Sequence, residues 1–145
     1  MSIYRNAAVR RAALALVLSL PFSAAFAHDS YYQQFGQKPG IKAVVNRFIG
    51  YVLADHRISH YFSATDIPNL KAALTDQFCQ EEGGPCRYTG PSMADVHQSL
   101  GVNETAFNAL VADLIKGMDR QHIPLDAQNN LLAKLAPMES QIVTR

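Results

Sequence analysis

One histidine of the chain is placed where its imidazole could bind a metal. His97 belongs to an apolar group with Met93, Val96 and Leu100, at spacings that put all four on one short helix. A neutral imidazole in such surroundings can bind a transition metal, most simply the iron of a haem as its proximal ligand. The alternative is a core histidine that hydrogen-bonds to the backbone, and spacing alone favours it. His97 is therefore a candidate ligand and not yet a motif.

The two cysteines can form a disulfide close to this histidine in the sequence. Cys79 and Cys86 are separated by six residues that include Gly83-Gly84-Pro85. A bond between them would close a short loop and brace the chain that leads to His97. Two free thiols are the alternative. The spacing excludes a covalent haem-attachment motif, which needs two cysteines separated by two residues and followed by a histidine.

Apolar residues recur every three or four positions along the first half of the chain, which predicts two helices. The first begins near Pro39-Gly40, and the second begins at Thr65 or Asp66 and ends before Gly83. Their apolar faces consist of Ile41, Val44, Val45, Phe48, Ile49, Val52 and Leu53 in the first helix, and of Ile67, Leu70, Leu74 and Phe78 in the second. A short apolar turn that contains Phe62 joins them.

The second half of the chain is predicted to hold three more helices, of which the first carries His97. The expected boundary residues are, in chain order, Ser92 and Gly101, then Asn103 or Thr105, then Pro124. Pro137 falls inside the last apolar pattern and should break that helix. No segment has the alternation and the composition of a strand, so the sequence predicts an all-α fold.

The first 27 residues differ from the rest. A basic start with three arginines precedes an apolar run over residues 12–20 and then Ala25-Phe26-Ala27, which is typical of a secretory signal cleaved after Ala27. The apolar stretch over residues 12–27 is interrupted by polar residues and a proline, and it is shorter than the ~20 residues that span a bilayer. An uncleaved membrane anchor is the alternative. We expect residues 28–145 to form one exported domain, located in the periplasm.

The net charge of the domain limits the kinds of partner that it can bind. The 145 residues carry a net charge of +1, but three of the 13 basic residues and none of the 12 acidic ones lie in the signal segment. The remaining domain is mildly acidic, at −2. Such a domain lacks the basic face that nucleic-acid binding requires. We therefore expect no nucleic acid as a partner and, once the signal is cleaved, no stable membrane insertion.

Several short motifs carry a family resemblance. They are Val52-Leu53-Ala54-Asp55, Tyr61-Phe62, Gly83-Gly84-Pro85, Tyr88-Thr89-Gly90, Met93-Ala94-Asp95-Val96-His97-Gln98 and Leu135-Ala136-Pro137-Met138. In this order they resemble the truncated haemoglobins, and most closely group 1, the short two-over-two globins. The resemblance runs from about Tyr31 to Val143. It implies a truncated globin fold, a two-over-two helical sandwich around a b-type haem.

The resemblance also implies which side chains hold the haem. His97 would be the proximal iron ligand, and the haem would lie between its helix and the second long helix. Phe62 matches a phenylalanine that packs on the porphyrin, Phe78 matches an aromatic residue of the pocket wall, and Lys71 could approach a propionate. The remaining positions matched to the pocket or to the haem edge are Leu70, Leu74, Tyr88 and Met93.

The distal pocket departs from the family pattern. Group 1 globins usually place a tyrosine on the first long helix and a polar residue on the next, whereas the matching positions here are Ile49, Leu70 and Leu74. None of the three has a hydrogen-bond donor. Bound oxygen carries partial negative charge, and a hydrogen-bond donor would help to retain it. Because these positions have no donor, we expect fast oxygen release and a pocket that favours neutral diatomic gases. Tyr61 and His60 could replace the donor, but we favour surface positions for both.

The sequence is compatible with three functions. The leading one is an exported haem protein that binds oxygen, nitric oxide or carbon monoxide reversibly. A nitric oxide dioxygenase, or another redox haem enzyme, would also need an electron donor, and the missing tyrosine disfavours efficient turnover. The third is a haem-free helical module that binds a protein partner, and the sequence context of His97 disfavours it.

Overall fold

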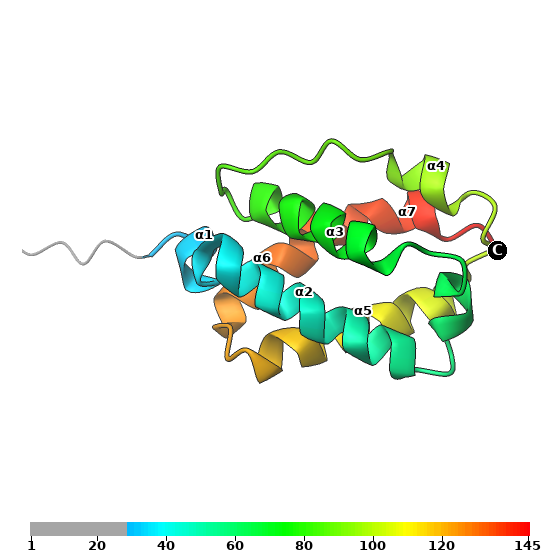
Figure 1. The fold of residues 1–145 in the computed structure, drawn as a ribbon, viewed down its shortest axis with the longest axis horizontal. Helices are drawn as coiled ribbons and strands as arrows, with labels where there is room; N and C mark the ends of the chain where they lie inside the picture. Colours follow the sequence, from blue (N-terminus) through cyan, green and yellow to red (C-terminus); the bar gives the residue numbers. More distant parts are fainter. Residues whose placement is uncertain (1–28) are drawn as a thin grey trace, which may run out of the picture.

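The computed structural model describes residues 29–145, which fold into helices without any β-strand (Figure 1). The predicted all-α fold is therefore confirmed. The predicted signal segment lies outside the described residues. No helix within residues 29–145 is long and apolar enough to cross a membrane.

Seven α-helices and two 3-10 helices make up the described chain. They are, in order, α1 (Tyr31–Gln34), α2 (Gln37–Ala54), η1 (Ser59–Phe62), α3 (Ile67–Glu81), α4 (Met93–His97), α5 (Glu104–Arg120), α6 (Leu125–Leu135), η2 (Ala136–Met138) and α7 (Glu139–Ile142). Helix α1 was not predicted, because a helix of four residues is too short to show an apolar period. Ser30 and Gln33 hold it with a reciprocal capping box.

Side-chain caps explain why the predicted helix starts are confirmed. Asp66, Ser92 and Asn103 each accept a hydrogen bond from the backbone N–H three residues later, at 3.2, 3.1 and 2.8 Å respectively. The start of α2 was predicted slightly too late. The helix begins at Gln37, and Pro39 lies in its first turn, where the missing N–H of a proline removes no helical hydrogen bond.

The last apolar pattern is broken where Pro137 predicts it. Helix α6 ends at Leu135, a 3-10 turn follows over η2, and α7 then resumes the helix for four residues. The short helix α4 packs against α7, and η2 also contacts α7. The C-terminal segment formed by η2 and α7 is therefore the support on which the histidine helix rests.

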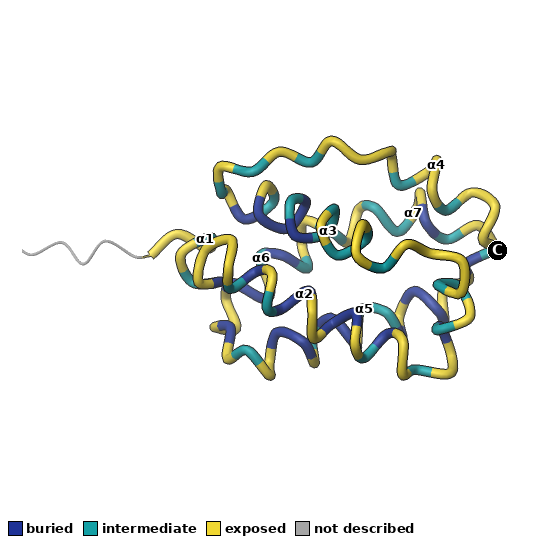
Figure 2. Tube along the Cα trace, in the orientation of Figure 1, coloured by how far each residue is buried: buried dark blue, intermediate teal, exposed yellow. Residues whose placement is uncertain are grey.

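Helix α2 is the centre of the core. It packs against α3 on one side and against α5 on the other, and the buried residues gather along its inner face (Figures 1 and 2). Ile49 is 1% exposed within this face. Gly117 lets α5 approach, because a Cβ at this position would lie 3.2 Å from the Phe48 backbone. Leu53 was wrongly assigned to the buried face: it is 44% exposed, at the edge of the apolar stripe.

Candidate functional site

The imidazole of His97 is held in one orientation by its own helix. His97 is the last residue of α4 and is half-buried, and its Nδ1 lies 2.7 Å from the backbone carbonyl oxygen of Met93. A carbonyl oxygen only accepts hydrogen bonds, so Nδ1 carries the hydrogen and donates it. In the neutral ring Nε2 then keeps its lone pair. This tautomer and this backbone hydrogen bond are typical of a metal-binding histidine.

The apolar neighbours of His97 are only partly covered by protein. Met93 is half-buried and packs against the core, whereas Val96 and Leu100 are 41% and 40% exposed. The predicted apolar group thus exists on α4, but the described chain leaves much of its surface open. A large apolar ligand would remove such surface from water.

Helix α3 presents three different faces. Lys71 and Thr75 lie toward α2, where a cavity of about 370 Å³ is also lined by Lys38 and Lys42. Asn69 and its neighbours lie toward the segment 88–91, where a second cavity measures about 280 Å³. The third face carries half-buried Leu70 and Leu74, which pack against the core.

The predicted site residues occupy several of these environments. Phe78 is 2% exposed and belongs to the core, as does Ile49. Phe62 is half-buried at the end of η1. Lys71 lines the lysine-rich cavity between α2 and α3. Its contact with a haem propionate remains a prediction.

Tyr88 is fixed by its own loop. Its hydroxyl donates to the carbonyl oxygen of Pro91 at 2.7 Å, and its backbone N–H donates to the side chain of Gln80 at 2.9 Å. The ring folds over Gly90 so closely that a Cβ there would lie 2.4 Å from the Tyr88 hydroxyl oxygen. A larger residue at position 90 would require the Tyr88 ring to move. Tyr88 also lines the second cavity, beside α3.

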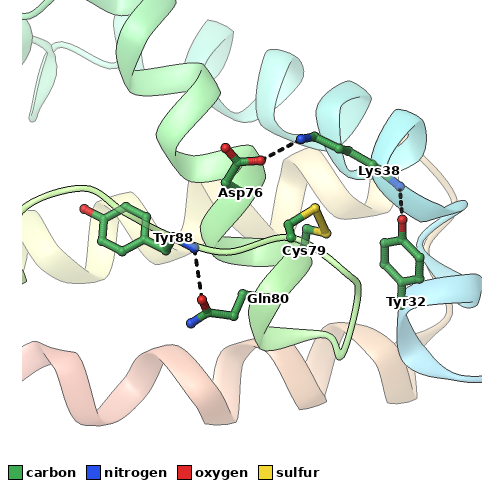
Figure 3. Close-up of a disulfide and its surroundings, with 7 residues drawn as sticks. Tyr32, Lys38, Asp76, Cys79, Gln80 and Tyr88 are labelled. Atoms are coloured by element: carbon green, nitrogen blue, oxygen red, sulfur yellow. Dashed lines mark hydrogen bonds and ion pairs between the residues drawn. A yellow bond between two sulfur atoms is a disulfide. The ribbon is translucent and has the colours of Figure 1, made fainter.

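A disulfide ties the end of α3 to the loop that leads to α4 (Figure 3). The Cα atoms of Cys79 and Cys86 are 5.6 Å apart, and their sulfurs are bonded. Cys79 is completely buried. Close to this bond, Lys38 pairs with Asp76 at 2.7 Å and links α2 to α3. The chain between the disulfide and Ser92 therefore starts from a fixed point.

The alternative distal donors of the turn η1 lie elsewhere. The Tyr61 hydroxyl donates to the carbonyl oxygen of Gly101 at 3.5 Å, which directs it to the loop between α4 and α5. His60 is exposed, and its ring stacks on Tyr61 with the ring centroids 4.1 Å apart. His60 therefore lies at the surface as expected, whereas the surface position expected for Tyr61 is wrong, because its ring is half-buried and packs against the core.

Five buried polar residues of the described chain were not predicted, and two of them lie in or at the end of α3. Gln77 of α3 is 6% exposed and Glu82, at the end of the same helix, is 4% exposed. Burial raises the pKa of Glu82 to about 7 even though Asn130 donates to its carboxylate. Gln77 could have been noticed, because it follows Leu70 by seven positions and Leu74 by three on an otherwise apolar stripe.

A family model described as bacterial-like globin matches residues 30–144, nearly all of the described chain. The chain belongs to the bacterial-like globin family. Among its curated relatives, the group 1 truncated hemoglobin GlbN of Mycolicibacterium paratuberculosis is 30% identical over 115 residues, which cover 79% of this chain and 85% of the relative. The group 1 truncated hemoglobin of Tetrahymena pyriformis is 32% identical over 86 residues, 59% of this globin and 71% of the relative.

Solved structures share the fold of this globin. The Fe(III) form of truncated hemoglobin from Tetrahymena pyriformis superposes with a TM-score of 0.76 at 24% identity, covering 81% of this chain and all of that one. The 2/2 hemoglobin of a Synechococcus species, solved in the cyanomet state with covalently attached heme, gives a TM-score of 0.74 with the same coverage. The predicted truncated globin fold is confirmed.

The residues of this globin fit a haem. His97 offers one free ring nitrogen, held by the bond to Met93. Apolar side chains with remaining exposure lie near it in the sequence and on the third face of α3. A macrocycle needs such apolar walls and one axial nitrogen ligand. The site chemistry and the family membership therefore agree.

Proposed function

We propose that this chain is an exported globin that binds haem through His97 and reversibly binds a diatomic gas. The observation that carries the proposal is the hydrogen bond from His97 Nδ1 to the Met93 carbonyl oxygen, 2.7 Å long. It leaves Nε2 free for iron and holds the ring against rotation. A core histidine bonded to the backbone is the alternative, but His97 is only half-buried, and Val96 and Leu100 beside it in the sequence are 41% and 40% exposed.

Other residues of the chain have separate tasks in this proposal. Leu70 and Leu74 form an apolar wall, Phe62 packs on the macrocycle, and Met93 and Tyr88 border its edge. Bound haem would supply the iron that binds a gas molecule. The side chains of the pocket would exclude water and set how long the gas remains. The apolar residues Ile49, Leu70 and Leu74 favour neutral diatomic gases over charged ligands.

The haem in this proposal is b-type, held without a covalent bond to cysteine. The two cysteines of residues 29–145 are bonded to each other, so neither thiol is free to attach a vinyl group. Their disulfide also supports export, because such bonds persist in oxidising compartments. Cleavage after Ala27 would release the domain, and the N-terminal sequence of the protein from the periplasmic fraction tests this step. A mature protein that begins at Met1 would contradict it.

An absorption spectrum tests the haem assignment. We expect purified wild-type protein to show a Soret band, which shifts when carbon monoxide is added after reduction. His97→Ala should abolish the band, whereas His56→Ala, at an exposed position, should keep it. A His97→Ala protein with unchanged haem content and spectrum would overturn the assignment of His97. Wild-type protein without any haem affinity would overturn the function itself.

A further inference from the structure

Gln77 is a buried amide without a strong hydrogen-bond partner. The side chain is 6% exposed, and its Nε2 donates to the Met138 sulfur at 3.5 Å. This is the one hydrogen bond that the side chain makes within the described chain. A thioether sulfur is a weak acceptor. The amide nitrogen therefore exchanges water for a weak acceptor on folding.

A second buried glutamine shows what a structural role looks like in the same protein. Gln128 is 5% exposed, and its Nε2 donates to Asp119 Oδ1 and to the carbonyl oxygen of Ile123, both at 2.9 Å. These two oxygen acceptors connect α6 to the last turn of α5 and to the loop between the two helices. Gln77 makes no comparable connection. Its polarity is thus not explained by what holds the fold together.

The direction of Gln77 follows from the helix to which it belongs. With about 100° per residue, Gln77 projects within about 20° of Leu70, on the same side of α3 as Leu74. The other two faces of α3 lie toward α2 and toward segment 88–91. Met138, which Gln77 contacts, belongs to η2, and η2 is continuous with the helix α7 on which α4 packs. Gln77 and the helix of His97 therefore border the same C-terminal segment.

We propose that Gln77 is the hydrogen-bond donor of the gas pocket, acting on a polar diatomic ligand such as oxygen. This inference rests on the proposed function. The bond to sulfur is easily exchanged for a bond to an oxygen atom that carries partial negative charge. The donor that Ile49, Leu70 and Leu74 lack would thus come from the next turn of α3. The sequence alone predicted a pocket without a hydrogen-bond donor, whereas this proposal gives it one donor.

The expected effect is on the oxygen dissociation rate and on the polarity of the pocket. Replacing Gln77 by an apolar side chain should raise the rate by about one decade or more, which is the loss of one hydrogen bond to a charged acceptor. Fast release, as predicted from the three apolar positions alone, should then appear in the variant. The C–O stretching frequency of the reduced protein under carbon monoxide should rise, because a positive dipole near the ligand lowers it.

The experiment uses wild-type holoprotein, Gln77→Leu and Gln77→Met, with Gln128→Leu as the matched control. Methionine keeps the length of the side chain, so Gln77→Met guards against a folding defect of Gln77→Leu. Both Gln77 variants should change the stretching frequency and the oxygen rate. The urea midpoints of the holoproteins should stay equal or rise. Gln128→Leu should lower the urea midpoint and leave the frequency unchanged.

The measurements distinguish a failure of the role of Gln77 from a failure of the haem function. Equal stretching frequencies and oxygen rates in wild type and Gln77→Met, with a normal Soret band in both, would overturn the role of Gln77 and leave the haem function intact. A fall in the urea midpoint of Gln77→Met as large as that of Gln128→Leu would show a structural glutamine and also overturn it. Loss of the Soret band from the wild type would overturn both levels.

Discussion

Both carboxylate oxygens of Glu82 lie 3.2 Å from the amide nitrogen of Asn130. This contact joins the end of α3 to α6, at a point where Glu82 is 4% exposed. The amide stabilises the charged carboxylate, but burial outweighs it and raises the pKa of Glu82 from 4.5 to about 7. The neighbouring Glu81 raises the pKa further, and Lys134 opposes it.

The first prediction is that the globin loses stability as the pH rises toward 7. Because the pKa of Glu82 is higher in the folded than in the unfolded chain, the folded chain binds the extra proton. The corresponding stability is complete below about pH 4.5 and is lost as the pH rises through about 7. The difference corresponds to at most about 3 kcal/mol. Urea unfolding of wild type and Glu82→Gln between pH 5 and 8 measures it.

Glu82→Gln supplies its own control, because glutamine cannot titrate. Its free energy of unfolding should vary less with pH over this range than that of the wild type, and it should exceed the wild-type value at pH 8. A pH dependence that is the same in both proteins would contradict the assignment to Glu82.

The second prediction concerns the disulfide. The bond between Cys79 and Cys86 closes a loop with a sequence separation of seven residues, which stabilises the folded chain by about 2–3 kcal/mol in the loop-entropy treatment. The double variant Cys79→Ser and Cys86→Ser should lower the free energy of unfolding by this amount. Haem affinity should also fall, because the loop leads to His97. Reductant should weaken the wild type and leave the double variant unchanged. Equal stability of oxidised and reduced wild type would contradict the prediction.

The third prediction concerns a buried acid of α5. Asp113 is 7% exposed, and its Oδ2 has no hydrogen-bond partner within the described chain. Burial raises the pKa of Asp113, and the nearby Asp55 raises it further, whereas Lys116 and Arg57 lower it. Stability is therefore lost as the pH rises through the pKa of Asp113. Asp113→Asn should be more stable at pH 8, by about 1–2 kcal/mol, and the gain should shrink in acid.

A neutralised surface acid separates this local effect from a change in net charge. Glu104→Gln removes one negative charge from an exposed position at the start of α5 and should give no such gain. If Asp113→Asn is less stable than wild type at pH 8, the carboxylate contributes more than its burial costs, and the prediction is wrong.

The helices were predictable because their signals are local. A capping side chain such as Asp66 and a proline such as Pro137 act within one turn of their own position, so their effects can be read without a structure. The exposure of Leu53 and the burial of Gln77 depend on which neighbouring helix covers each position. A single apolar pattern does not contain that information, so Leu53 was wrongly placed on the buried face and the burial of Gln77 was not predicted.

The site was predictable in part. The context of His97 made it the candidate ligand, and this assignment stays a prediction; the hydrogen bond that fixes its tautomer was not predictable, because it depends on the rotamer of the ring relative to the Met93 carbonyl. The surroundings of Lys71 were not predictable. A single lysine on a helix gives no sign of the two lysines of α2 that line the same cavity. Residues from different helices meet only through tertiary packing.

The fourth prediction concerns the addition of a donor to the apolar face of α3. Leu70 is half-buried, and glutamine has a similar size, so Leu70→Gln should fold normally. A carboxamide there should slow oxygen release by about tenfold, in wild type and in Gln77→Met alike. Stopped-flow measurement of oxygen dissociation tests this. Ala72→Gln is the matched control, because it places the same side chain about 200° around α3 at an exposed position and should leave the rate unchanged. If Leu70→Gln releases oxygen at the wild-type rate, as Ala72→Gln should, then Leu70 does not face the gas.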